Sequence, residues 1–284
     1  MDATHATLED LIAKLFIARP DVKAIQQPGG EYFTHTRGPR ENPTYIPWSR
    51  SELTAHLAGT STFGHYLLST DNKCKFFAFD VDLDKVGTLP TLPMDNVNSD
   101  EDAQAWVSSF RAGSNPREAW KDRAHPARPF LKGALMQAAI KLEREISKLG
   151  IPALTVYSGN KGIHVYGFLG LMEAGLVRQA GFLVMEALGC VQVKGDIFWK
   201  FGQSLEDDLN DLLTIELFPK QDELDEGRFG NLMRVPLGRN LKSADPTFII
   251  DTSGNSPINV MVPVQDAHAS LASVLESLQT AQLV

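Results

Sequence analysis

The chain has 284 residues, 43% hydrophobic and 22% charged, which is ample for a large core and excludes disorder over its whole length. Its net charge of −8, from 27 Lys and Arg against 35 Asp and Glu, excludes nucleic-acid binding by bulk positive charge alone, but allows a local basic groove or a bound metal. The 2 cysteines exclude four-cysteine zinc sites and disulfide frameworks, and no apolar run approaches the ~20 residues that span a membrane. Because the chain starts without a signal-peptide pattern, we expect a cytoplasmic protein with no membrane contact.

The N-terminal part predicts two helices and several strands. Residues 7–18 have apolar side chains at helical spacing, and Thr7 and Asp10 resemble a capping box. A strand and a turn follow, and residues 49–58 predict a short helix that Gly59 ends. Residues 63–68 and 75–81 predict strands, and the second is apolar on both faces, which is typical of a buried strand.

The next stretch, residues 86–130, is polar and shows no helical or strand period. It is interrupted by Pro90, Pro93, Pro116, Pro126 and Pro129. We interpret it as an insertion, partly helical, that is mobile or contacts a ligand.

Regular patterns return after this insertion. Helices are predicted at residues 131–149, 173–188 and 265–280, and strands at 153–157, 163–168, 212–218, 230–237 and 247–251. Because these elements do not alternate strictly, we expect an α+β fold with a mainly antiparallel sheet.

The first motif with chemical meaning is Asp80-Val81-Asp82, at the end of the apolar strand. Residues i and i+2 of a strand share a face, so Asp80 and Asp82 project together and favour a hard divalent cation such as Mg²⁺ or Mn²⁺ between them. The alternative is a strand end with solvated acids, which Asp84 nearby supports. Metal-dependent glycosyltransferases also carry Asp-x-Asp after an apolar strand.

The second motif is a Gly-rich turn between two predicted strands. Ser158, Lys161 and the turn N–H groups form a plausible phosphate cradle, and His164 lies on the strand that leaves the turn. The spacing is not that of a Walker A loop. The alternatives are an ordinary hairpin and a satisfied core histidine.

The third motif centres on Glu216, an acid with apolar neighbours on both sides that needs a cation or a hydrogen-bond partner if it is buried. An outward-facing strand position is the alternative. Arg234 and Arg239, further along the chain, are candidates to reach phosphates.

Taken in order, these motifs resemble the archaeo-eukaryotic primase superfamily, and more closely the primase–polymerase domains of the TOTE conflict-system type. CRISPR-associated primase–polymerases and ligase-linked polymerase domains are similar at a greater distance. The resemblance rests on residues 19–24 (Arg-Pro-Asp-Val-x-Ala), 56–59 (His-Leu-x-Gly), 158–164 (Ser-Gly-x-x-Gly-x-His) and 216–221 (Glu-x-Phe-Pro-Lys-Gln). It covers most of residues 10–251 except the insertion.

The resemblance implies a set of site residues. The three metal-binding acids, which are also the catalytic residues, would be Asp80, Asp82 and Glu216. The nucleotide's triphosphate would bind to Ser158, Lys161, His164 and Arg234. Two departures stand out: many members have Asp in place of Glu216, which leaves Asp251 as a competing third acid, and Gly162 stands where others have Ser.

The resemblance also implies a fold and an activity. The fold would be one domain over residues 1–284, with an N-terminal α/β module at about 1–70, the insertion at about 86–130 and a catalytic core at 71–85 plus 131–284. That core would be a primase-like, RRM-like antiparallel sheet with helices. The activity would be that of a DNA primase–polymerase, a nucleotidyltransferase that uses two Mg²⁺ or Mn²⁺ ions, nucleoside triphosphates and a single-stranded DNA template with or without a primer.

The resemblance also implies partners, and two alternative functions stay open beside it. Local Lys and Arg with stacking aromatics, for example Trp48, Trp106, Trp120 or Trp199, would hold the template. A helicase, in the same polypeptide or in a partner, would strengthen binding by a chain this acidic. The alternative functions are a metal-dependent glycosyltransferase built on Asp80-Val81-Asp82 and a catalytically inactive nucleic-acid-binding subunit.

Overall fold

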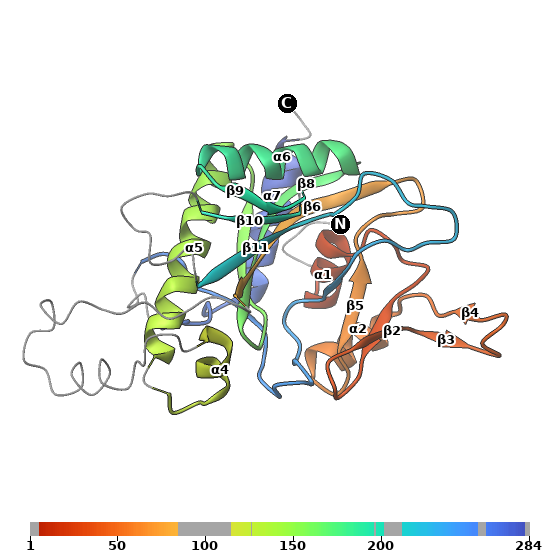
Figure 1. Ribbon diagram of the computed structural model, residues 1–284. Helices are drawn as coiled ribbons and strands as arrows, with labels where there is room; N and C mark the ends of the chain where they lie inside the picture. Colours follow the sequence, from red (N-terminus) through yellow and green to blue (C-terminus); the bar gives the residue numbers. More distant parts are fainter. Residues whose placement is uncertain are drawn as a thin grey trace, which may run out of the picture.

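The computed structural model describes residues 6–84, 115–125, 127–195, 197–201, 212–254 and 260–281. In this part of the chain the largest unit is a sheet of seven strands in which all neighbours are antiparallel (Figure 1). Its order is β13 (Phe248–Ile249), β7 (Ala153–Tyr157), β8 (Gly162–Glu173), β6 (Lys73–Leu83), β11 (Leu213–Phe218), β10 (Phe198–Lys200) and β9 (Val191–Lys194).

The two faces of this sheet are covered differently. Helices α5 (Arg128–Lys148) and α6 (Ala174–Ala187) pack on the face that carries Phe77, Phe79 and Val81 of β6. On the other face, the ring of Phe16 from α1 (Leu8–Phe16) packs edge-on against Phe76 of β6 and against two rings of β8. Because α1 covers only one end of that face, the other end of β6, with Asp80 and Asp82, is left for polar side chains.

The N-terminal residues build a second, smaller sheet. Its order is β12 (Leu232–Arg234), β5 (Phe63–Tyr66), β1 (Ala24–Gln26) and β2 (Tyr32–Thr34), again antiparallel. Helix α2 (Arg50–Leu57) follows a projecting hairpin of β3 (Thr36–Arg37) and β4 (Thr44–Tyr45) (Figure 1). Since β12 comes from far along the chain, it ties residues 232–234 to the N-terminal part.

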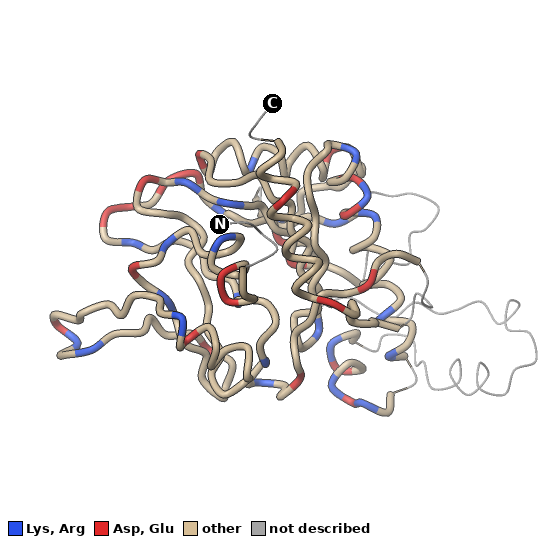
Figure 2. Tube along the Cα trace, turned by 180° about the vertical axis from the view of Figure 1, so that it is seen from behind, with Lys and Arg blue, Asp and Glu red and all other residues tan. Residues whose placement is uncertain are grey.

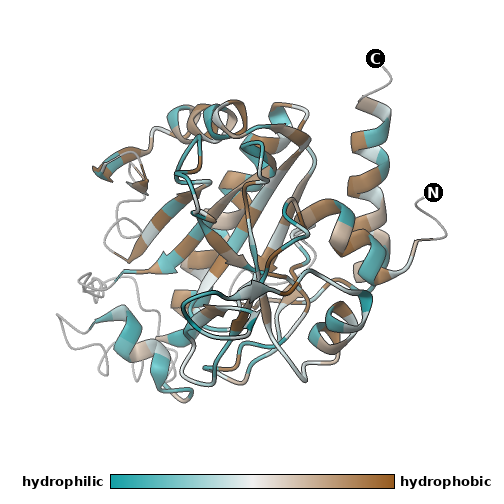
Figure 3. Cartoon of the chain, turned by 90° about the vertical axis from the view of Figure 1, so that its right-hand side faces the viewer, coloured by the Kyte–Doolittle hydropathy of each residue, from teal (hydrophilic) through white to brown (hydrophobic). Residues whose placement is uncertain are grey.

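One continuous cluster of buried apolar side chains joins α1, α5, α6 and the central strands. Figure 3 shows the hydrophobic residues gathered on the strands and on the inner sides of the helices. The last helix, α7 (Ala267–Ala281), packs on α1 and extends this cluster through Leu271. No helix in the described ranges is long and apolar enough to cross a membrane.

The α+β class with antiparallel sheets is confirmed. The capping box is present, because the Asp10 N–H donates to Thr7 Oγ1 at 3.3 Å and the Thr7 N–H donates to Asp10 Oδ2 at 3.0 Å. The predicted helix at 131–149 begins three residues earlier, in α5, and part of the predicted insertion forms helix α4 (Pro116–Lys121). Residues 86–114 and 126 of that insertion lie outside the described residues.

Candidate active site

The three predicted acids lie on adjacent strands of the large sheet. In the register of the sheet, Asp80 of β6 is opposite Glu216 of β11 on one side and His164 of β8 on the other. Asp82 is opposite Thr214 and Gly162. Since alternate residues of a strand share a face, all these side chains project from the face that α5 and α6 do not cover.

These acids line an open groove of about 760 Å³. The strand neighbours hold them in place: Val81, Ile215 and Leu217 are at most 1% exposed and anchor β6 and β11 in the core. Basic side chains also line the groove, namely Arg117, Lys161, Lys194 and Lys200. The groove therefore combines a row of carboxylates with cations at its edges.

Each acid has a different partner. Lys161 forms an ion pair with Asp82, and Lys220 forms one with Glu216. Arg117 lies 3.6 Å from Asp82 (Nη2 to Oδ2), and its Nε donates to the Leu83 carbonyl at 2.6 Å. These basic side chains neutralise the two outer carboxylates.

Asp80 is the exception. Its nearest basic group among the described residues is the His164 imidazole, with Nε2 at 3.5 Å from Oδ1. Burial lowers the pKa of His164 to about 3, so this ring is neutral at physiological pH and supplies no positive charge. Burial together with the neighbouring Asp82 and Glu216 carboxylates raises the pKa of Asp80 well above its usual value. A cation bound here would relieve that repulsion.

The donor chemistry fits a hard divalent cation, because three carboxylates on adjacent strands supply the oxygen ligands that Mg²⁺ and Mn²⁺ prefer. Within the described ranges, no three His, Cys, Asp or Glu side chains have already converged as they would around an ion. Instead, Lys161 forms an ion pair with Asp82, and Lys220 forms one with Glu216. A metal at Asp80, Asp82 and Glu216 would therefore take the place of these amines.

The Gly-rich turn joins β7 to β8 next to the acids. The Ser158 N–H donates to the Gly162 carbonyl at 3.1 Å, and Gly159 has a φ of +78°, which favours glycine. A Cβ at position 162 would meet the Asp82 carboxylate and lie 2.7 Å from the Val81 carbonyl oxygen. These close contacts explain why glycine is favoured at position 162.

Arg234 lies on the other side of the turn. Its Nη1 donates to the Ser158 carbonyl, and its Nε donates to the Tyr32 hydroxyl at 2.8 Å. Ser158 and Arg234 thus connect the turn to the small sheet, whereas Lys161 and His164 point to the acids. The four predicted nucleotide-binding residues surround one corner of the large sheet.

The two candidate third acids are far apart. Glu216 lies beside Asp80, whereas Asp251 follows β13 at the edge of the sheet and accepts a hydrogen bond from the Ser253 N–H at 2.9 Å. Arg239 donates to the Ala244 carbonyl at 2.8 Å. Neither Asp251 nor Arg239 lines the groove that contains Asp80, Asp82 and Glu216, which we call the acidic groove.

Several residues at the site were not predicted. Arg117 lies in the polar insertion, where no period pointed to it, and only the fold brings it to Asp82. Lys220 is part of the predicted motif at 216–221, but its ion pair with Glu216 depends on how the chain turns after β11, which the spacing of the two residues does not indicate. Asp84, which also lines the groove, pairs with Lys200 at 2.9 Å and accepts a hydrogen bond from Thr214 at 3.0 Å.

The prediction that tryptophans stack on template bases is wrong for two of them. Trp120 and Trp199 are each 5% exposed and belong to the core, so they offer no free ring face to a base. The Arg128 guanidinium lies over the Trp120 ring, and the Phe182 ring packs against Trp199. Trp48 is half-buried and packs edge-on against Phe63. Trp106 lies outside the described residues.

Fold and site together define a mixed α+β protein with an acidic groove on an antiparallel sheet. The profile of one protein family, the archaeo-eukaryotic primase domain of the TOTE conflict system, matches residues 10–278. Because the match spans nearly the whole chain, the chain belongs to this family, which confirms the resemblance found in the sequence.

The chain has no match among curated proteins. Among solved structures, it is similar to the polymerase domain from Mycobacterium tuberculosis Ligase D in complex with DNA, at 13% identity and a TM-score of 0.30, over 97% of this chain and 88% of that one.

Proposed function

We propose that the chain is a DNA primase–polymerase, which transfers a nucleotide from a nucleoside triphosphate to a primer 3′-hydroxyl or to a first nucleotide on single-stranded DNA. The observation that carries the proposal is the row of Asp80, Asp82 and Glu216 beside the Gly-rich turn, in a member of a primase family. The large sheet and its helices are then the RRM-like primase core, and the domain division is the one expected from the sequence.

Asp80, Asp82 and Glu216 would hold Mg²⁺ or Mn²⁺, which lowers the pKa of an attacking hydroxyl and stabilises charge on phosphate oxygens. Lys161 is positioned to exchange its bond with Asp82 for one with a phosphate. Arg234, held between the turn and Tyr32, and the buried Ser158 would fix the triphosphate from the other side. His164, which is neutral, would accept or donate a single hydrogen bond rather than supply charge.

The proposed partners follow from this role: nucleoside triphosphates, single-stranded DNA or a primer–template, and a helicase in the same polypeptide or in a partner. The alternative function, a glycosyltransferase, would use Asp80-Val81-Asp82. It would not explain why Glu216 lies opposite Asp80 or why the Gly-rich turn lies beside them.

The test is nucleotide incorporation on a single-stranded template, with and without a primer, in Mg²⁺ or Mn²⁺. We expect Asp80→Asn, Asp82→Asn and Glu216→Gln each to reduce incorporation by at least about a hundredfold, because each removes an anionic ligand. Asp251→Asn is the matched control and should retain incorporation, since Asp251 lies away from the groove. Normal incorporation by any of the three folded variants, or none by the unmodified protein, contradicts the proposal.

A further inference from the structure

A second groove, of about 660 Å³, lies between helix α4, the Gly-rich turn and the loop at residues 242–245. Its lining is strongly basic, with two acids, Glu118 and Asp245, against six basic side chains: Arg117, Lys121, Arg123, Arg128, Lys161 and Lys242. In a chain of net charge −8, this is a local reversal of charge. Figure 2 shows Lys and Arg gathered on and just after α4, at the edge of the molecule.

Both acids in this basic groove are already neutralised. Glu118 pairs with Lys121 at 2.7 Å, and Asp245 pairs with Arg123 at 2.7 Å. Of the other four cations, Lys161 and Arg117 contact Asp82, whereas Arg128 and Lys242 form no ion pair with a described carboxylate. The lining therefore carries more positive than negative charge, which favours an anion with several charges over a cation or a neutral ligand.

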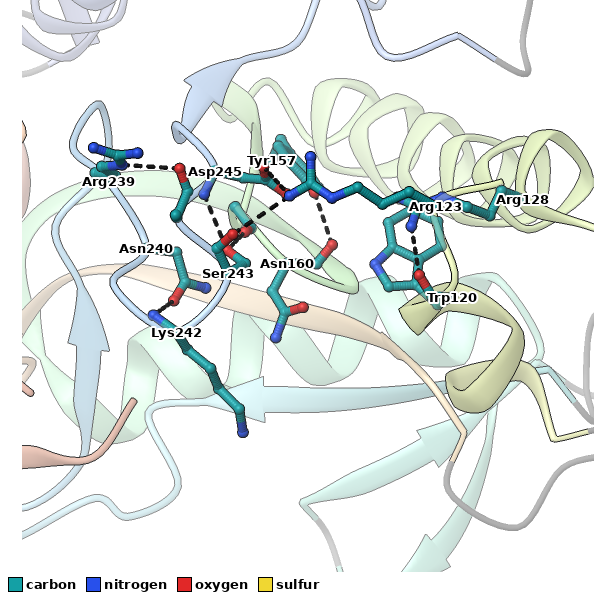
Figure 4. Close-up of polar contacts among 12 residues, drawn as sticks. Trp120, Arg123, Arg128, Tyr157, Asn160, Arg239, Asn240, Lys242, Ser243 and Asp245 are labelled. Atoms are coloured by element: carbon teal, nitrogen blue, oxygen red, sulfur yellow. Dashed lines mark hydrogen bonds and ion pairs between the residues drawn. The ribbon is translucent and has the colours of Figure 1, made fainter. Parts of the chain in front are cut away.

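The walls of the groove are fixed by contacts between segments that are far apart in the sequence. Arg123 bridges to Asp245, and Ser243 Oγ donates to the Gly159 carbonyl of the turn. The Arg128 guanidinium lies over the Trp120 ring at 4.4 Å and donates to the Trp120 carbonyl. Figure 4 shows Arg123 and Arg128 on one wall, facing Ser243 and Asp245 on the other.

The basic groove is continuous with the acidic groove, because Arg117 and Lys161 line both. These two side chains also touch Asp82. A polyanion in the basic groove would thus lead directly to the row of acids.

We propose that this basic groove binds the phosphate backbone of the single-stranded template and leads it to the acids, an inference that rests on the proposed function. A strand fits better than a triphosphate because the side chains of Lys121 and Arg123 are each 70% exposed, so the cations continue from the junction to the outer surface. Trp120 is buried and offers no ring to a base. Binding should therefore be independent of sequence and strongly dependent on salt.

The test measures the affinity of the full chain for a labelled oligothymidine by fluorescence anisotropy, over a NaCl titration in EDTA without nucleotides. Lys121→Ala combined with Arg123→Ala removes two cations that do not touch the acids of the row. We expect about tenfold weaker binding and a smaller slope of log K against log salt, by about 0.7 for each phosphate that is no longer neutralised. The apparent KM for nucleotides should not change.

The matched control combines Lys148→Ala with Arg50→Ala. Lys148 is also 70% exposed and pairs with a glutamate three residues away, and Arg50 is 61% exposed, but both lie outside the basic groove. This variant should bind as the unmodified protein does. Thermal unfolding of both variants shows whether they are folded.

Two results overturn the proposal. The first is an unchanged affinity and salt slope when Lys121 and Arg123 are both replaced by alanine. The second is a raised nucleotide KM in that variant with strand binding intact, which would assign the groove to a triphosphate. Because the binding assay needs neither metal nor catalysis, its outcome is separate from the incorporation test. Strand binding through the groove without incorporation would reject the proposed function and keep the groove.

Discussion

At the residue scale, the site is organised around Asp80, the one acid of the row that has no Lys or Arg in contact within the described ranges. Asp82 is held by Lys161 and lies near Arg117, and Glu216 is held by Lys220. The carboxylate at the centre of the row therefore carries the repulsion of the other two. We expect the Asp80 carboxylate to destabilise the metal-free protein, because the same negative charge that attracts a cation is repelled by its neighbours when no cation is bound.

This difference gives a stability prediction for two neighbouring acids. Asp80→Asn should raise the free energy of unfolding at pH 7.5 in EDTA by about 1 kcal/mol, or about 2–4 °C in Tm, because it removes a repelled charge. Asp82→Asn should lower it or leave it unchanged, because it leaves Lys161 and Arg117 without their carboxylate.

Differential scanning fluorimetry of both variants checks this pair. Added Mn²⁺ should raise the Tm of the unmodified protein and raise that of Asp80→Asn less. A loss of stability in Asp80→Asn equal to that in Asp82→Asn would show that the row of acids is not under electrostatic strain.

At the element scale, strong hydrophobic patterns predicted the right elements. The continuous apolar run before Asp80 predicted the central strand β6, whose two faces are both buried. Strands β9 and β10 were missed because all four residues of β9 are exposed and β10 has three residues, so neither shows an apolar period. Such short strands form because they pair with a neighbouring strand, and their own sequences do not show that pairing.

The residues of the candidate site could likewise be predicted only in part. The i, i+2 spacing placed Asp80 and Asp82 on one face without further information. The register that sets Glu216 opposite Asp80 depends on strand pairing across the sheet, which the sequence analysis did not predict. Glu216 was proposed as the third acid only through the resemblance to a family. Arg117 could not be predicted, because its return to Asp82 depends on how a polar insertion packs.

Helix α6 provides a prediction about packing between elements. A Cβ at Gly181 would lie 2.6 Å from Leu217 Cδ1 of β11, whereas a Cβ at Gly175 would have its nearest neighbours, atoms of Asp222, at 3.6–3.9 Å. Gly181→Ala should therefore destabilise the protein by about 1–3 kcal/mol through overpacking, despite the better helix propensity of alanine.

Gly175→Ala is the control on the same helix. It should be neutral or stabilise the protein by up to about 1 kcal/mol, because alanine favours the helix and meets only ordinary contacts. Urea unfolding of both variants measures the difference. Equal stability of the two variants would show that α6 can move away from β11 at little cost.

At the scale of the whole molecule, one buried histidine, His65, packs between the two sheets, and a second, His56, lies within the N-terminal part. His65 of β5 packs against Phe16 of α1 and Phe76 of β6, at ring distances of 6.2 and 5.8 Å. His56 of α2 accepts a hydrogen bond from the Phe63 N–H at 3.1 Å, and its Nε2 lies 3.0 Å from the Val235 carbonyl. Both imidazoles are fully buried, and that of His65 lies at the junction between the N-terminal part and the large sheet.

These two histidines make the stability of the whole chain dependent on pH. Burial lowers the pKa of His65 to about 3 and that of His56 to about 4, from 6.5 in the unfolded chain. Because the unfolded state binds protons first, the free energy of unfolding is highest above pH 6.5 and falls as the pH drops toward 4, by about 2 kcal/mol for each histidine between pH 7 and 5.

His65→Leu removes one of these titrating groups. The free energy of unfolding should therefore fall less steeply below pH 6.5, as measured by urea unfolding at several pH values. Phe76→Leu, which disturbs the same packing without a titrating group, should lower stability equally at every pH. If His65→Leu keeps the full slope, the protons that destabilise the protein bind elsewhere, and the junction between the sheets is not where acid acts.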